Sequence, residues 1–207
     1  MNWIQQNLAF NEEEHVYTYN NRVVTGVSTV LGSVGTKDKN GNWHPVGFDD
    51  RWINDDVHTN FGTAFHKIPP IILRGNTPSY PESMESHVKN LLMFFAANKI
   101  VPLEDKEGRM ICEYPMLSER YRYAGTPDLV CTIKDQIYLI DWKTSSSYCH
   151  HWGYQLAAYE QLIKEVHGIK KKIHRMVVRV NEDNYHVHKF ADPVDFTKFV
   201  SCLNILR

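Results

Sequence analysis

Two aspartates and a lysine in the middle of the chain have the types and spacing that suit metal-dependent hydrolysis. Asp128 follows Gly125, Thr126 and Pro127, and Asp141 comes 13 positions after Asp128. If the strands that carry the two aspartates pair as a hairpin, both carboxylates lie at one end of a sheet. Two such charges repel unless one takes a proton or a cation lies between them. Mg²⁺ meets this need, since it favours carboxylate oxygens and retains room for water and phosphate.

Lys143 lies two residues beyond Asp141, so on a strand the two side chains share one face. An ammonium group there could lower the pKa of a metal-held water or stabilise charge on phosphorus. The alternative is a surface ion pair worth less than about 1 kcal/mol. Asp141 ends the apolar run 137–140, where a charge is costly unless it faces a functional cleft.

The expected helices and strands describe an α/β fold with a mixed central sheet flanked by helices. A hairpin over 15–24 turns at Asn20 and Asn21, and a second turn at Lys134 and Asp135 joins two strands. Thr25 or Ser28 is the expected N-cap of a helix within 25–31, and 35–47 is expected to be an exposed, mobile loop. The remaining expected helices are 48–67, stopped or bent by Pro69 and Pro70, 83–99 and 154–167, and the expected strands are 109–114, 126–133, 136–141, 173–180 and 185–190.

The chain of 207 residues is expected to form one domain. Within it, residues 1–60 supply the N-terminal hairpin, the mobile loop and a helix. Residues 61–190 form the catalytic core, and 191–207 form a C-terminal helix. No apolar run approaches the roughly 20 residues that a membrane helix needs, and the start lacks a secretory pattern. We therefore expect a cytoplasmic protein without membrane contact.

The four cysteines are far apart in sequence and form no CxxC pair, which predicts reduced thiols and neither zinc nor an iron–sulfur cluster. The formal net charge of −1 is unusual for a nucleic-acid-binding protein, which normally has a Lys and Arg surplus. A charge sum also counts carboxylates that hold metal ions and is silent about clustering.

Four motifs, in order, resemble those of the RecB-like branch of the PD-(D/E)XK nucleases. They are Gly62-Thr63-Ala64-Phe65-His66, Gly125-Thr126-Pro127-Asp128, Ile140-Asp141-Trp142-Lys143-Thr144-Ser145 and Gln155-Leu156-Ala157-Ala158-Tyr159. Within that branch the chain is similar to the group of the mitochondrial genome maintenance exonuclease and its phage and bacterial relatives. The resemblance covers 62–159, and the absence of an Arg-rich transit segment favours a phage or bacterial source, with the host cytoplasm as the location.

The resemblance implies a role for each matching residue. The implied metal ligands are His66, Asp128, Asp141 and the backbone carbonyl of Trp142. Glu113, which lies outside the four motifs, matches a glutamate often found before the second motif in the family and is a further implied ligand. Lys143 becomes the water-activating or charge-stabilising residue, so the catalytic set is Asp128, Asp141 and Lys143. Gln155 and Tyr159 lie four residues apart and share a helix face, where they would brace Lys143 or touch the substrate strand.

The activity implied is a DNA exonuclease that uses one or two Mg²⁺ or Mn²⁺ ions in replication, recombination or repair. Its partner would be DNA, single-stranded or with free ends, and protein partners are left open. The alternatives are a catalytically silent DNA-binding or assembly module with a nuclease fold, and a restriction-type endonuclease.

Further residues could contact DNA, although packing or solvation is the ordinary role of each. Candidates for stacking on unpaired bases are Trp43, Trp52, Tyr148 and Trp152, and candidates for a phosphate track are Lys164, Lys170, Lys171, Lys172, Arg175 and Arg179.

Overall fold

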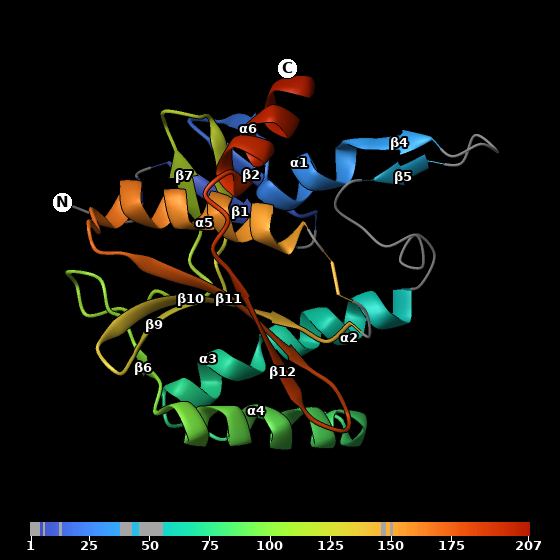
Figure 1. Cartoon of the computed structure of the whole chain (residues 1–207), viewed down its shortest axis with the longest axis vertical. Coiled ribbons are helices and arrows are strands. Elements are labelled where there is room, and N and C mark those ends of the chain that lie inside the picture. The colour runs from blue at the N-terminus through green and yellow to red at the C-terminus, as the bar shows by residue number, and fades with distance from the viewer. Residues whose placement is uncertain are drawn as a thin grey trace.

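A five-stranded mixed sheet, with strand order β12–β11–β10–β9–β6, forms the centre of the protein (Figure 1). The computed structural model describes residues 5, 7–12, 14–37, 43–45, 56–145, 148–149 and 151–207. The strands of the sheet are β6 (Val101–Pro102), β9 (Leu129–Ile133), β10 (Gln136–Lys143), β11 (Ile173–Val180) and β12 (Tyr185–Phe190). β10 and β11 are parallel, whereas the other neighbours are antiparallel.

Helices cover both faces of this sheet, so the predicted α/β class is confirmed (Figure 1). One face, called the α5 face below, packs against α1 (Val27–Ser33), α5 (Trp152–His167) and α6 (Asp195–Ile205). The opposite α4 face packs against α2 (Asp56–His66), α3 (Ile68–Leu73), the 3-10 turn η2 (Glu82–Met84) and α4 (Glu85–Asn98). Side chains of β10 alternate between the two cores: Leu139 enters the first, and Ile140 and Trp142 enter the second.

The predicted N-terminal hairpin is confirmed and belongs to a separate three-stranded sheet. Its strands are β1 (Leu8–Asn11), β2 (Val16–Tyr19) and β3 (Arg22–Val24). Asn20 and Asn21 turn the chain with φ angles of 50° and 60°, a conformation that asparagine tolerates well. Tyr17 packs in a small core with Leu117 and Ala124. These two residues come from an additional hairpin of β7 (Met116–Ser118) and β8 (Tyr123–Gly125).

Two expectations for the segment that follows β3 are wrong. Gly26 is the N-cap of α1 and no side chain caps the helix, so neither Thr25 nor Ser28 has the expected role. Within the expected loop, β4 (Gly35–Lys37) pairs with β5 (Trp43–Pro45), because short antiparallel strands can satisfy their backbone groups without an apolar period. Residues 38–42 and 46–47 of that expected loop lie outside the described residues.

The helix expected over 48–67 is α2, which begins at Asp56 and ends at His66. Residues 48–55, which include Trp52, lie outside the described part of the chain. The proline pair marks the end of α2 but also lies in the first turn of α3, where a missing N–H costs no helical hydrogen bond. The expected helices over 83–99 and 154–167 and the strands over 173–180 and 185–190 are confirmed.

The strand expected over 109–114 is wrong. Met110 and Cys112 make only isolated bridges, to Glu104 and Leu129 respectively. Glu113 then adopts a left-handed backbone with φ of 49°, which interrupts any extended run. Within the described ranges, no helix has both the length and the apolar character that crossing a bilayer requires.

We predict that Gly125→Ala destabilises the protein because β8 and α5 touch at this residue. A Cβ there would lie 2.7 Å from Cε1 of Tyr159 and 3.0 Å from Cγ2 of Val27. Such overpacking lowers the free energy of unfolding by about 1–3 kcal/mol, measurable by urea denaturation. Gly62→Ala is the matched control, since its Cβ would meet Thr144 Oγ1 at an ordinary 3.6 Å and alanine favours the helix. Equal stability of the two variants would contradict the packing described here.

Candidate metal centre

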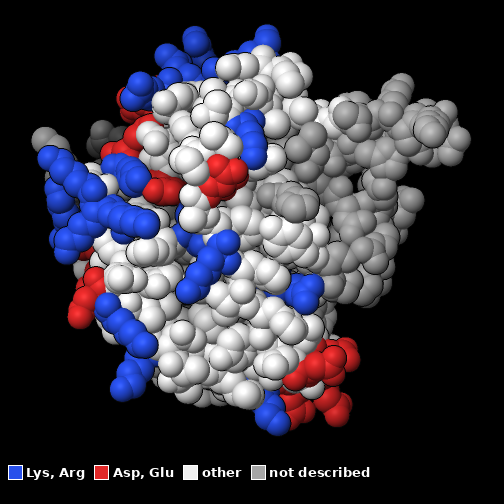
Figure 2. Space-filling view, viewed as in Figure 1, with Lys and Arg blue, Asp and Glu red and all other residues white. Residues whose placement is uncertain are grey.

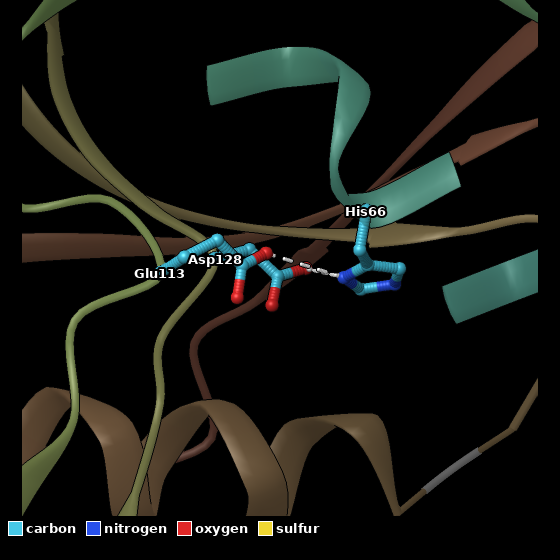
Figure 3. Close-up of side chains that lie close together, drawn as sticks. All are labelled: His66, Glu113 and Asp128. Carbon is cyan, nitrogen blue, oxygen red and sulfur yellow. Dashed lines mark ion pairs between the residues drawn. The ribbon is translucent and has the colours of Figure 1, made fainter. Parts of the chain in front are cut away.

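His66 is the last residue of α2, and its imidazole points toward two carboxylates (Figure 3). Its Nδ1 lies 3.3 Å from Oδ2 of Asp128 and 3.5 Å from Oε1 of Glu113. Phe65, the preceding residue, is fully buried in the core of the α4 face. Because consecutive helix residues point in different directions, burial of Phe65 fixes the direction in which His66 leaves the helix.

The hairpin of β9 and β10 positions the two aspartates, as the sequence predicts. Leu129 pairs with Ile140 at the end of the ladder, so Asp128 and Asp141 are the next residues beyond that pair. The backbone N–H of Trp142 donates a 2.7 Å hydrogen bond to Oδ2 of Asp128. Both carboxylates are buried, and the backbone bond fixes the Asp128 side chain against β10.

Glu113 reaches the same place from an irregular segment rather than from a strand. Its N–H donates to the carbonyl oxygens of Pro127, at 3.1 Å, and Asp128, at 3.2 Å. These bonds hold the left-handed backbone conformation, which costs free energy for a residue other than glycine. The ligand atoms of His66, Glu113 and Asp128 all lie within 4.8 Å of one another. Glu113, which lies outside the four sequence motifs, is therefore part of the cluster.

Asp141 and Lys143 lie beside this cluster as an ion pair. Nζ of Lys143 is 2.7 Å from Oδ2 of Asp141, in agreement with the shared face expected from their spacing. Asp141 is only 1% exposed, and its Oδ1 has no hydrogen-bond partner among the described residues. Burying an ionised carboxylate costs several kcal/mol unless it is well paired, so this oxygen is suited to a cation.

The charges in the cluster shift one another's pKa values. Burial lowers the pKa of His66, but Asp128 and Glu113 outweigh it and raise that pKa to about 10. Burial and the neighbouring Asp128 raise the pKa of Glu113 to about 7, against the opposing effect of His66. Burial acts to raise the pKa of Asp128, but His66 and Lys143 outweigh it and bring that pKa below its ordinary value. The cluster therefore demands positive charge, from a proton on His66 or from a metal ion.

Burial and neighbouring charges also oppose each other at Asp141 and Lys143. Burial raises the pKa of Asp141 to about 6, although Lys143 opposes the shift. Burial acts to lower the pKa of Lys143, but Asp141 and Asp128 outweigh it and raise that pKa above its ordinary value. Lys143 is consequently an ammonium ion at neutral pH.

This donor set fits a hard divalent cation. Besides Oδ1 of Asp141, Oε1 of Glu113 is buried without a hydrogen-bond partner among the described residues. Carboxylate oxygens with one imidazole are ligands that suit Mg²⁺ or Mn²⁺. In an antiparallel pair the N–H and C=O of one residue face the same neighbouring strand, so the carbonyl of Trp142 faces the side of Asp128. Its role as a ligand stays a prediction.

The helix after Lys143 contributes a second layer of polar groups. Nε2 of Gln155 donates a 3.2 Å hydrogen bond to the hydroxyl of Tyr159, as their four-residue spacing on α5 allows. Burial raises the pKa of Tyr159 well above its ordinary value, with further contributions from Tyr17, Asp141 and Asp128. The Tyr159 hydroxyl is thus a neutral donor close to the carboxylates, and substrate contact by this pair stays a prediction.

Two residues near the centre have no role in the sequence prediction. The hydroxyl of Tyr17 lies 2.8 Å from Oγ1 of Thr126, so β2 supports the turn that precedes Asp128. His151 is the N-cap of α5, and burial together with Lys143 lowers its pKa to about 4. The contact of Tyr17 spans 109 positions, and no local pattern reveals it. His151 follows Lys143 by eight positions in a His pair, which is the only local signal.

Comparison with known proteins adds little to this geometry. No protein-family model and no curated protein matches the chain. Among solved structures, it is similar to the protein titled SSO0001, at 16% identity and a TM-score of 0.37. The match covers 72% of this chain and 70% of that one, and at this TM-score it supports no conclusion about function.

We predict that Glu113→Gln and Asp128→Asn each weaken Mn²⁺ binding at least tenfold, because each removes a charged ligand. Isothermal titration calorimetry of the purified chain measures the affinity. Glu107→Gln is the matched control, since Glu107 pairs with Arg109 outside the cluster. Wild-type affinity in Asp128→Asn would show that the metal binds elsewhere.

Proposed function

We propose that this protein is a metal-dependent DNA exonuclease. The observation that carries the proposal is the convergence of His66, Glu113 and Asp128 beside the ion pair of Asp141 and Lys143. In this arrangement, carboxylates that can bind a cation lie next to an ammonium group that can stabilise negative charge as it develops during the reaction. When bound, Mg²⁺ or Mn²⁺ would polarise the scissile phosphate and increase the acidity of water.

Lys143 has the central role among the chain's own groups. Its ammonium is held by Asp141 at 2.7 Å and its side chain is 21% exposed, so a substrate can reach it. A preorganised positive charge at this position stabilises the negative charge that develops on a phosphate during hydrolysis. The same group would hold an attacking water by donating a hydrogen bond to it.

The surrounding groups keep Lys143 and the aspartates in place. Asp128 is fixed by the N–H of Trp142, and Asp141 anchors Lys143. Tyr159, with its hydroxyl held by Gln155, remains protonated because burial raises its pKa. It can therefore donate a hydrogen bond to a substrate oxygen, which supports the substrate role given to this helix face.

Two other functions remain as alternatives. A silent DNA-binding or assembly module would need no lysine beside the carboxylates, and the presence of Lys143 in that position favours an enzyme. A restriction-type endonuclease would use the same cation chemistry. It differs from an exonuclease in needing no DNA end.

The test uses end-labelled single-stranded DNA, duplex DNA, closed circular DNA and a matched RNA. We expect cleavage of linear DNA with Mg²⁺ or Mn²⁺, none in EDTA, and an intact closed circle, because an exonuclease starts at ends. Cleavage of the closed circle would show that the enzyme is an endonuclease. A preference for RNA would show that its substrate is RNA and not DNA. Inactivity on every nucleic acid would favour the silent module.

Lys143→Ala identifies the catalytic group in the same assay. We expect turnover to fall at least about 100-fold, with Mn²⁺ affinity equal to or tighter than wild type, since the variant removes a competing cation from Asp141. Lys89→Ala, at an exposed position of α4, is the control and is expected to retain full activity. Near-normal turnover in Lys143→Ala would exclude the role given to this lysine.

A further inference from the structure

A row of three side chains crosses the α5 face from Lys143 to the edge of the sheet. Lys143 on β10 pairs with Arg179 on β11, and Arg179 pairs with His186 on β12. Side chains of directly paired residues lie on the same face, and neighbouring strands are about 4.8 Å apart. The row therefore extends about 10 Å from the candidate metal centre to an edge strand.

An aromatic cluster, called the platform here, adjoins this row. It consists of Tyr148, Trp152, His188 and Phe190. The ring of Tyr148 lies 5.5 Å from Trp152, 5.3 Å from His188 and 6.2 Å from Phe190, the last in a nearly parallel orientation. His188 is two residues beyond His186 on β12, so both lie on the same face.

Tyr148 is the part of the platform that a ligand can reach. It is 46% exposed, whereas Trp152 beneath it is 3% exposed. An exposed ring that packs against a buried tryptophan and two partly buried rings presents a fixed flat surface at little cost in side-chain entropy. Unpaired bases stack on such rings, whereas the bases of a duplex already stack on one another.

Two other candidate residues for a phosphate track, Arg175 and Lys172, are not level with Lys143. Arg175 is 8% exposed, and its guanidinium forms ion pairs with Glu160 and Asp195. Figure 2 shows Lys and Arg side chains gathered over the end of α5 and the start of β11, toward the left of that view. Lys172 in that area precedes Arg179 by seven positions, which is about 23 Å along an extended strand. Among the candidate basic residues, Arg179 is the one level with Lys143.

We infer that a single strand of DNA crosses the sheet over Arg179 and His186, with one unpaired base stacked on Tyr148. This inference rests on the proposed nuclease function and names the form of DNA that the site takes. The guanidinium of Arg179 pairs with a backbone phosphate, which directs the strand toward Lys143. A positively charged path beside an aromatic ring is the combination that binds single strands without reading their sequence.

The test measures binding of a fluorescent oligonucleotide by anisotropy in EDTA, as a single strand and as the matched duplex. We expect Tyr148→Ala to weaken single-strand binding about 5- to 100-fold and Arg179→Met to weaken it and reduce its salt dependence. Tyr148→Phe keeps the ring and should bind as wild type does. Lys189→Met is the charge control, because Lys189 pairs with Met176 on the α4 face.

Cleavage assays on the same variants separate this inference from the proposed function. With Mn²⁺ present, KM for single-stranded DNA should rise in Tyr148→Ala and Arg179→Met while Mn²⁺ affinity stays unchanged. Wild-type binding and KM in both variants, or an equal loss for single strand and duplex, would overturn the inference and leave the nuclease standing. If the wild type cleaves nothing yet binds single strands through Tyr148 and Arg179, the proposed activity fails and the binding path stands. A wild type that binds neither form of DNA would refute both.

Discussion

Glu113, Asp128 and Asp141 bring three carboxylates into one mostly buried region, and their mutual repulsion is the constraint that the surrounding structure balances. His66 faces the first two at 3.3–3.5 Å, and Lys143 faces the third at 2.7 Å. These two cations still leave Oε1 of Glu113 and Oδ1 of Asp141 buried without a hydrogen-bond partner among the described residues. A protein tolerates this cost where the groups serve binding or chemistry.

Packing on both faces of the sheet keeps the carboxylates together. On the α4 face, the rings of Phe94 and Phe95 contact Trp142 edge-on, which fixes the strand whose N–H holds Asp128. On the α5 face, Tyr159 packs closely against Gly125, and Tyr17 contacts Thr126. The turn that leads into Asp128 is thus enclosed by α5 and the N-terminal hairpin, so two distant parts of the chain position one carboxylate.

The sequence predicts the parts of the centre that depend on local periodicity. The turn at Lys134 and Asp135 sets the register that brings Asp128 beside Asp141, and the residues of that turn have the positive φ angles such turns need. The shared faces of Asp141 with Lys143, and of Gln155 with Tyr159, follow from strand and helix repeats. His66 is predicted only through its motif, since nothing local to α2 indicates that it lies beside Asp128, just before β9.

The parts that sequence reasoning misses depend on contacts between distant segments. The sequence pattern places Glu113 on a strand, but its position results from a left-handed backbone held by carbonyls of Pro127 and Asp128. The β7–β8 hairpin is short, and its buried residues meet α1, α5 and β2, which no window of sequence reveals. The candidates for DNA contact also needed the structure, because burial separates Arg175 and Trp152 from the more accessible Tyr148.

Anomalous diffraction from crystals soaked in MnCl₂ tests the central claim most directly, because it locates the cation without assuming an activity. The account predicts a manganese peak within coordination distance of His66, Glu113 and Asp128, beside the ion pair of Asp141 and Lys143. The peak should disappear in Asp128→Asn crystals. Two results would contradict the assignment of this cluster as a metal centre. One is a fully occupied manganese peak elsewhere, and the other is the absence of any peak at saturating Mn²⁺ in a crystal whose packing leaves Lys143 open to solvent.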